Sequence, residues 1–226
     1  NKIDEIMLAM PSLSRSRQSE ILKNLSPLLI NVRIMPSMKG IADGQIKVED
    51  LREINIGDLL GRSSAPPNKE LLSIKVTNKI VMVTGAGGSI GSELCRQLLK
   101  LEPKSLILFE INEFALYKIH QELEQLLVKN TQIFPILGSI RDSNRLKKIS
   151  KNFKINTIYH AAAYKHVPLV EHNNSEGILN NIIGTMVLAK IAMNFDVETF
   201  VFISTDKAVR PTNTMGASKR VAELVL

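Results

Sequence analysis

A glycine-rich stretch in the middle of the chain has the composition of a phosphate-binding turn. Residues 84–91 read T-G-A-G-G-S-I-G and directly follow the apolar run 79–83 (K-I-V-M-V). Glycines at this spacing permit a tight turn, approach of the backbone to a diphosphate, and close packing of the next helix on the strand. The free amides of a helix N-terminus would then face the phosphates. The residues expected to form this site are Gly85, Gly87, Gly88, Ser89, Ile90 and Gly91.

A carboxylate ends the next apolar run. Glu110 directly follows residues 105–109 (S-L-I-L-F). In that place a carboxylate accepts hydrogen bonds from the adenosine ribose hydroxyls and repels a 2′-phosphate, which favours NAD over NADP as the cofactor. The alternatives are a solvated acidic residue at a strand end and a glycine turn with a purely structural role.

A second segment that could do chemistry lies near the carboxyl end. Residues 204–220 read S-T-D-K-A-V-R-P-T-N-T-M-G-A-S-K-R and follow the apolar run 199–204, so they leave a sheet at the edge where ligands bind. Asp206 and Lys207 can donate and accept protons, whereas Met215 has no exchangeable proton and cannot be a general base. Taken alone, the first two residues are typical of a surface ion pair, and Met215 is typical of a core residue.

These segments need a sheet that brings their ends together. Short β-rich runs alternate with helical patterns, which predicts an α/β fold: a doubly wound parallel sheet of the Rossmann type with helices on both faces. Pro135 removes a ladder hydrogen bond and leaves the bounds of the third strand open. The predicted strands are 79–83, 105–109, 132–137, 157–160 and 199–204. The predicted helices are 89–101, 113–129, 145–151 and 175–194, and a helical pattern also covers 218–226.

The first third of the chain is organised differently. Predicted strands at 5–10 and 31–35 flank apolar residues at helical spacing, which indicates part of a small α/β unit. Two prolines in S-S-A-P-P-N (63–68) block both helix and sheet, as in a linker. The expected division is a partial N-terminal α/β domain at 1–62, a linker at 63–78, and an NAD-binding domain of the Rossmann type at 79–226 that also carries the candidate catalytic segment.

Composition narrows the possible functions. The 226 residues are 44% hydrophobic and 23% charged, as in ordinary folded proteins. The net charge is +7, but the basic residues are scattered and aromatic residues make up only 4%, so we expect no nucleic-acid partner. Cys95 is the only cysteine, which favours a reducing compartment, and neither His120 nor His172 has a ligand-spaced partner, so we expect no metal. No apolar run reaches the roughly 18 residues of a membrane span.

The glycine spacing resembles the short-chain dehydrogenase/reductase superfamily in its extended branch. Three further phrases agree: G-S-I-R-D (138–142), A-A-A (161–163) and N-I-I-G-T (181–185). The resemblance implies that Ile140, Ala161 and Ala162 lie against the cofactor. Ser139 replaces the aspartate that contacts the adenine in this branch, which weakens that contact. Asn181 is most simply a structural hydrogen-bonding residue on an apolar helix.

Two longer sequence phrases resemble one particular family within this superfamily. Residues 204–220 and A-A-A-Y-K-H-V-P (161–168) closely resemble the membrane-associated polysaccharide-biosynthesis family of UDP-N-acetylglucosamine 4,6-dehydratases, in its long branch, where methionine replaces the superfamily's tyrosine. D-L-L-G-R (58–62) is that family's phrase before the catalytic domain. The family's reaction oxidises sugar carbon 4 with NAD⁺, eliminates water across carbons 5 and 6, and returns the hydride to carbon 6. Lys165 and His166 would face the sugar nucleotide.

Position in the motif gives each catalytic residue a role. The resemblance implies that Asp206 protonates the departing carbon-6 hydroxyl and that Lys207 removes the carbon-5 proton. Thr205 would bind the carbon-4 oxygen and Lys219 the nicotinamide ribose, with Met215 in the place of the tyrosine. The proton that a tyrosine would take leaves through water or through Asp206, and the sequence does not distinguish these routes.

Two other functions stay open: a UDP-sugar epimerase of the same fold, and a non-catalytic dinucleotide-binding module, because the tyrosine is missing. The family carries transmembrane helices before this region and a substrate-binding portion after it. The resemblance thus implies a full-length protein at the cytoplasmic face of the inner membrane, attached through segments that this soluble fragment lacks. We expect the fragment to bind NAD weakly and to turn over little UDP-N-acetylhexosamine. A homo-oligomer is among the open alternatives.

Overall fold

The computed structural model describes residues 73–126 and 131–226, the segments 5–8 and 31–34, and residues 10, 17, 20 and 21. The chain divides into two compact units, Asn1–Pro66 and Pro67–Leu226. In the first unit, β1 (Glu5–Leu8) and β2 (Asn31–Ile34) pair in parallel. Most of the helix expected between them, and the D-L-L-G-R phrase, lie outside the described residues.

The second unit is built on a parallel sheet whose strand order is β5-β4-β3-β6-β7. The strands are β3 (Ile80–Thr84), β4 (Ser105–Glu110), β5 (Gln132–Leu137), β6 (Thr157–His160) and β7 (Thr199–Phe202). Chain order reverses at β3, which pairs with both β4 and β6, so the carboxyl ends of these strands flank the crevice where such sheets bind ligands. The predicted doubly wound α/β fold is confirmed.

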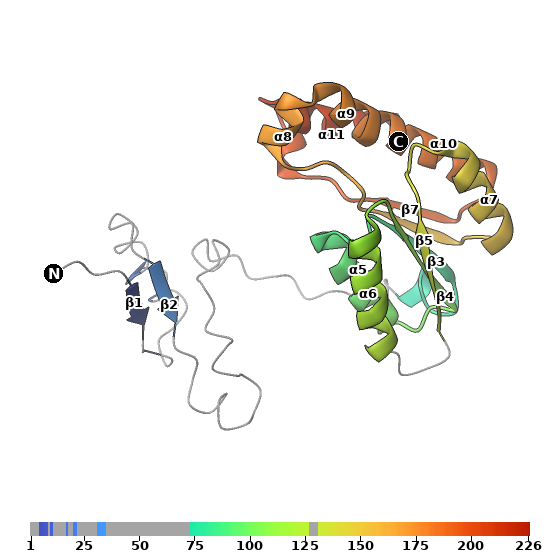
Figure 1. Ribbon diagram of the computed structural model, residues 1–226, viewed down its shortest axis with the longest axis horizontal. Helices are drawn as coiled ribbons and strands as arrows, with labels where there is room; N and C mark the ends of the chain where they lie inside the picture. The colour runs from blue at the N-terminus through green and yellow to red at the C-terminus, as the bar shows by residue number, and fades with distance from the viewer. Residues whose placement is uncertain are drawn as a thin grey trace. The chain divides into compact units, whose positions relative to one another are not determined.

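Alternate residues of the strands face two separate cores. Val81 and Val83 of β3 pack with α5 (Ser89–Leu99) and α6 (Glu113–Leu126), whereas Met82 packs with α7 (Ser143–Phe153) and α10 (Thr185–Asn194). Successive side chains of a strand point to opposite faces, so a central strand covered on both sides must be apolar throughout. Figure 1 shows the two pairs of helices on opposite faces of the sheet.

Strand β5 lies at an edge of the described sheet and contains Pro135. Proline has no N–H, so it is compatible with a strand mainly where one side is unpaired. The predicted bounds of this strand are therefore correct despite the proline. At the end of the predicted linker, residues 73–78 form a helical turn, and Val76 is fully buried in the core.

Three segments above the sheet differ from the sequence prediction. The helix expected at 175–194 consists of α9 (Asn174–Ile178), a π-helix (Leu179–Gly184) and α10. An additional helix, α8 (Val167–His172), begins with a proline in its first turn. The last helix, α11 (Thr214–Val225), begins before residue 218, because the Asn213 carboxamide caps it by accepting a hydrogen bond from the amide of Gly216 at 2.8 Å.

Candidate active site

The glycine turn after β3 packs too closely to hold ordinary side chains. Gly85 has a φ of +68°, and a Cβ there would lie 2.7 Å from Ala162. A Cβ on Gly91 would overlap the carbonyl oxygen of Gly85. At Gly88, which is exposed, an added Cβ would lie 3.3 Å from the Gly85 oxygen, a tight contact but without the overlap found at Gly91. An exposed glycine at the start of a helix leaves the backbone open to a ligand.

The N-terminus of α5 fits an anion. No side chain among the described residues caps this helix, whose first residues Ser89 and Ile90 are exposed. Its first amides have no partners within the helix and carry the positive end of the helix dipole. The Lys165 ammonium donates a hydrogen bond to Ser89 Oγ at 2.7 Å, which brings a positive charge to the same place. Lys165, which the sequence analysis expected to face the sugar nucleotide, is therefore beside the predicted diphosphate position.

Backbone amides hold the carboxylate of Glu110 in a fixed orientation. Its Oε2 accepts a hydrogen bond from Gly87 N at 3.0 Å, and its Oε1 accepts from Ile111 N and Asn112 N at 2.8 and 2.9 Å. The residue is buried at the end of β4. A carboxylate has about four acceptor positions, so the three amides leave capacity for a ribose hydroxyl. The main-chain partners could not be foreseen from the sequence.

A cavity of about 250 Å³ opens at the carboxyl ends of the strands. Its wall contains Asn180, a buried residue of the π-helix that the sequence analysis did not select. Ile140 enters this wall because Gly184 has no side chain: a Cβ there would lie 2.6 Å from Ile140 Cδ1. The predicted cofactor residues that line the cavity are Gly85, Gly87, Gly88, Glu110, Ile140, Ala161 and Ala162. Those that lie outside its lining are Ser89, Ile90, Gly91 and Lys219.

The predicted catalytic segment forms a separate cluster at the end of β7. Asp206 and Lys207 are exposed on a short 3-10 turn, Asp206–Ala208. The Thr205 hydroxyl donates to Asp206 Oδ1 at 3.0 Å, and its oxygen accepts from the Lys207 amide at 3.3 Å. This turn rests on α11, where a side chain at Gly216 would overlap the carbonyl oxygen of Lys207. Gly216 is thus a positioning residue, recognisable in the sequence only as part of the M-G-x-S-K phrase.

Lys219 of α11 is buried against the aromatic ring of Phe202. Its ammonium donates to the carbonyl oxygen of Ile203 at 2.8 Å and lies 3.8 Å from the centroid of the Phe202 ring. Burial lowers the pKa of Lys219 to about 8, and the Glu223 carboxylate partly opposes this shift. An ammonium has three donors, so Lys219 keeps capacity for another acceptor.

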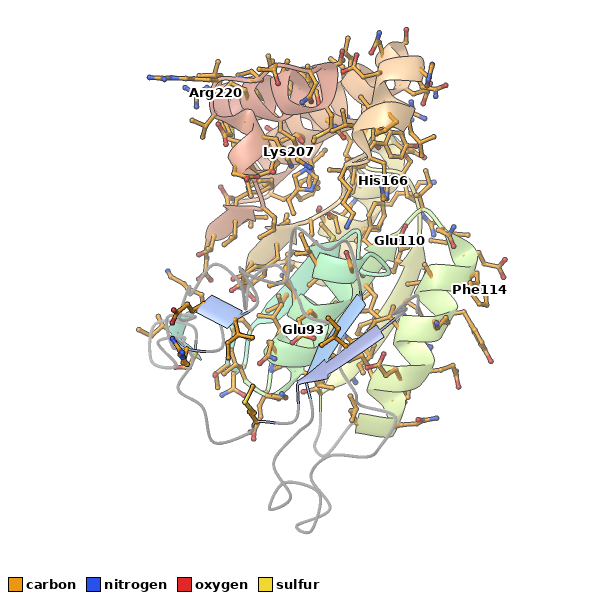
Figure 2. All side chains as sticks on the ribbon, turned by 90° about the vertical axis from the view of Figure 1, so that its left-hand side faces the viewer. Glu93, Glu110, Phe114, His166, Lys207 and Arg220 are labelled. Atoms are coloured by element: carbon orange, nitrogen blue, oxygen red, sulfur yellow. The ribbon has the colours of Figure 1, made fainter. Side chains whose placement is uncertain are left out.

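The other predicted residues lie on the helices around these clusters. Met215 is 2% exposed in α11, so its side chain is packed inside the domain. The exposed His166 precedes α8, and Figure 2 shows it between Lys207 above and Glu110 below. Glu171 of α8 holds the start of α11 through hydrogen bonds from the backbone amide and hydroxyl of Thr214, at 2.6 and 3.1 Å. The segment 165–172 therefore contacts both the start of α5, through Lys165, and the start of α11, through Glu171.

Metal-binding clusters and membrane-spanning helices are both lacking among the described residues. Within them, no three His, Cys, Asp or Glu side chains gather closely enough to bind a metal ion. None of the helices in this part of the chain combines the length and the apolar character that crossing a bilayer requires.

Residues 81–226 match the family described as polysaccharide biosynthesis protein. Together with the glycine turn and the S-T-D-K segment on one parallel sheet, this match decides the family. The chain belongs to it. The resemblance read from the motifs is therefore confirmed, and the polysaccharide biosynthesis family is of the extended short-chain dehydrogenase/reductase type.

Relatives of this polysaccharide biosynthesis chain include enzymes of two reaction types. The capsular polysaccharide biosynthesis protein CapD of Staphylococcus aureus is 42% identical over 225 residues, which cover all of this chain and 38% of CapD. A UDP-N-acetylglucosamine 4,6-dehydratase (inverting) of Campylobacter jejuni is 30% identical over 146 residues, 64% of this chain and 42% of that protein. A UDP-glucose 4-epimerase of Rickettsia rickettsii is 32% identical over 149 residues, 65% of this chain and 42% of the epimerase.

A solved structure shares the fold. The dTDP-glucose 4,6-dehydratase DesIV of Streptomyces venezuelae, with NAD and TYD bound, matches with a TM-score of 0.54 and 25% identity, over 64% of this chain and 49% of DesIV. This chain thus spans less than half the length of the relatives it matches.

We predict that Gly91→Ala disrupts the turn. The added methyl group has no room beside the Gly85 carbonyl, so β3 and α5 must separate. We expect a loss of roughly 2–3 kcal/mol in the free energy of unfolding and at least about a tenfold weaker affinity for NAD, measured by urea denaturation and calorimetric titration. Ser92→Ala, one residue further along the same helix, is the matched control. Equal NAD affinities of the two variants would contradict the prediction.

The lowered pKa of Lys219 predicts how stability depends on pH. The unfolded chain keeps this proton up to about pH 10.4, whereas the folded chain releases it near pH 8. The unfolded state therefore binds more protons between these values, so the free energy of unfolding rises with pH, by at most about 1.4 kcal/mol per pH unit. Below pH 8 the folded chain holds Lys219 in its charged form, so the free-energy cost of burying that charge lowers stability in full there.

Lys219→Met should remove this rise, while Lys190→Met, which changes an exposed lysine on α10, should retain it. Denaturant unfolding at several pH values from 7 to 10 measures both slopes. A rise that persists unchanged in Lys219→Met would show that another group causes it.

Proposed function

We propose that this chain is part of a UDP-N-acetylglucosamine 4,6-dehydratase of surface-polysaccharide biosynthesis. The observation that carries the proposal is the position of Asp206 and Lys207, exposed and held against α11 at the carboxyl end of β7. A proton donor and a proton acceptor on adjacent residues can act on two neighbouring carbons of one sugar. The 4,6-dehydratase relative from Campylobacter jejuni supports the same reaction.

A nicotinamide dinucleotide fits the residues that are present. The uncapped start of α5 and the ammonium of Lys165 would bind its diphosphate, and Glu110 would bind the adenosine ribose. The buried carboxylate already accepts three amide hydrogen bonds, and a second negative charge beside it would be repelled. This favours NAD over NADP. When bound, the cofactor supplies a hydride acceptor for sugar carbon 4 and returns the hydride at carbon 6.

The residues of this chain would manage the protons of the elimination. Lys207 removes the proton from carbon 5, which is acidic only after carbon 4 has become a ketone. Asp206 gives a proton to the departing carbon-6 hydroxyl, so one water leaves and a double bond forms between carbons 5 and 6. The hydride returned to carbon 6 and a solvent-derived proton at carbon 5 would then complete the 4-keto-6-deoxy sugar. Thr205 binds the carbon-4 oxygen. Met215 is buried and has no exchangeable proton, so the proton that a tyrosine would take from the carbon-4 hydroxyl goes to water or to Asp206.

A UDP-sugar 4-epimerase is the second candidate, since an epimerase is among the relatives. An epimerase oxidises and reduces carbon 4 only, so it needs no acid–base pair for carbons 5 and 6. We extend the proposal to the whole protein: it would act at the cytoplasmic face of the inner membrane, attached through segments outside this chain. We also propose that this chain alone binds NAD weakly and turns over little sugar nucleotide.

The role of Glu110 predicts a change in cofactor preference. In Glu110→Gln one carboxylate oxygen becomes an NH₂ group, which cannot accept hydrogen bonds from the amides or the ribose. We expect at least about a tenfold loss of NAD affinity and a smaller ratio of NAD to NADP affinity, measured by calorimetric titration with each cofactor. Glu113→Gln, at the start of α6, is the control. An unchanged ratio would contradict the assignment of Glu110.

The elimination itself can be tested with deuterium oxide as the solvent, in a protein of the relatives' full length. A dehydratase must replace the carbon-5 proton with one from solvent, so the 4-keto-6-deoxy product should carry deuterium at carbon 5 by mass spectrometry and NMR. Asp206→Asn and Lys207→Met should each lower product formation at least about 100-fold. Val209→Ala, on the same loop, is the control. Inversion at carbon 4 without deuterium at carbon 5 would establish the epimerase instead.

A further inference from the structure

A histidine with no place in the proposed chemistry lies at the centre of the site. His160, the last residue of β6, is completely buried. Its Nδ1 is 2.7 Å from Thr84 Oγ1 at the end of β3, and its Nε2 is 2.9 Å from Thr185 Oγ1 at the start of α10. The rings of Phe200 and Phe202 lie 5.9 and 5.5 Å away, centroid to centroid. Each ring nitrogen therefore has one threonine hydroxyl as its partner, and the two phenylalanine rings lie beside the imidazole.

The partners on each side of the ring select the same tautomer. The Thr185 hydroxyl donates to the carbonyl oxygen of Asn181 at 2.7 Å, so its oxygen must accept a hydrogen bond from Nε2–H. On the other side, the Thr84 oxygen accepts from the amide of Ala162 at 3.4 Å, so its proton is free to go to Nδ1. In the opposite tautomer, Nδ1 would carry the proton, so the Thr84 hydroxyl could no longer donate to it. The Thr185 hydroxyl would then face two acceptors, the Asn181 carbonyl oxygen and the unprotonated Nε2, and its single proton could satisfy only one of them.

A charged imidazolium would be incompatible with this chain of hydrogen bonds, because both of its nitrogens donate. The environment also opposes the charge. Burial, and then the positive charge of Lys219 beyond the Phe202 ring, lower the pKa of His160 to about 3. His160 is therefore a fixed neutral connector rather than a proton carrier.

The hydrogen-bonded chain connects the segments that surround the cofactor cavity. Thr84 immediately precedes the glycine turn, and Ala162 is the residue against which that turn packs. At the other end, the side chain of Asn181 accepts from Tyr164 N at 2.8 Å and donates to Tyr164 O at 3.0 Å. It also donates to Ser218 Oγ of α11 at 2.9 Å. The imidazole thus links the end of β3, just before the glycine turn, to the start of α10 and the π-helix, and Asn181 of the π-helix in turn holds the loop after β6 and α11.

We propose that His160, held as the neutral Nε2–H tautomer, is a positioning residue for the dinucleotide: its hydrogen bonds to Thr84 and Thr185 fix the glycine turn and the π-helix at the separation that the cofactor requires. The inference rests on the proposed dinucleotide binding and does not depend on which sugar reaction follows. His160 touches neither cofactor nor substrate. It acts through Thr84, Ala162 and Asn181.

The first test determines the protonation of the ring. In this chain with ¹⁵N-labelled histidine, long-range ¹H–¹⁵N correlation spectra should show one histidine with a protonated Nε2 and an unprotonated Nδ1, unchanged from pH 8 to pH 5. His160→Gln identifies that signal by removing it. A protonated Nδ1, or a ring that titrates near the ordinary value of about 6.5, would overturn the proposal.

The second test separates positioning from general stability. Thr84→Val and Thr185→Val keep the side-chain shape but remove the hydrogen bonds to His160. The matched control is Thr157→Val, at the opposite end of β6, whose hydroxyl is also largely buried and donates to the carbonyl oxygen of Lys75 at 2.7 Å. All three variants lose one buried hydroxyl from the same domain, so similar losses of stability are expected.

Only the two variants beside His160 should bind NAD at least about tenfold more weakly by calorimetric titration. Equal NAD affinities for all three variants would overturn the positioning role. Complete absence of NAD binding by the unaltered chain would instead refute the proposed dinucleotide site, while the ring measurement would still decide the tautomer.

Discussion

The site depends on one steric constraint, the close contact between the glycine turn and the loop after β6. Neither Gly85 nor Gly91 has room for a side chain, because the turn packs directly on Ala162 and on itself. This contact puts the start of α5 beside the loop that carries Lys165, and the two meet at Ser89. The amides that we propose bind the diphosphate and a positive charge are therefore brought together by backbone packing.

Electrostatic differences then distinguish the two parts of the site. Around the cavity, the charge of Glu110 is met by three main-chain amides, which turn a buried acid into a fixed acceptor. At the end of β7, Asp206 and Lys207 remain exposed, while Lys219 is buried above an aromatic ring. The carboxylate that we assign to cofactor binding is thus held by main-chain hydrogen bonds, whereas the residues assigned to proton transfer are exposed on a short turn. Such a separation suits a reaction in which the cofactor stays and the sugar leaves.

The fold was largely predictable because apolar runs and turn residues carry local information. Strands 132–137 and 157–160 have the predicted bounds, and each glycine of the turn is explained by its neighbours or its exposure. Long-range hydrogen bonds were not predictable. Nothing in the local pattern indicates the π-helix, whose Asn181 binds the backbone of Tyr164, or the capping of α11 by Glu171. The motifs predicted a catalytic segment at 204–220, which stays a prediction, and the contact of Gly216 with the Lys207 carbonyl beneath it needed coordinates.

Pro135 has an effect beyond the bounds of its strand. As part of β5 it removes one main-chain donor from an outer edge of the described sheet. Another extended polypeptide that tried to continue the sheet there would find an interrupted template. Pro135 therefore makes this edge of the described sheet a poorer template for strand addition than an unbroken row of N–H donors would be.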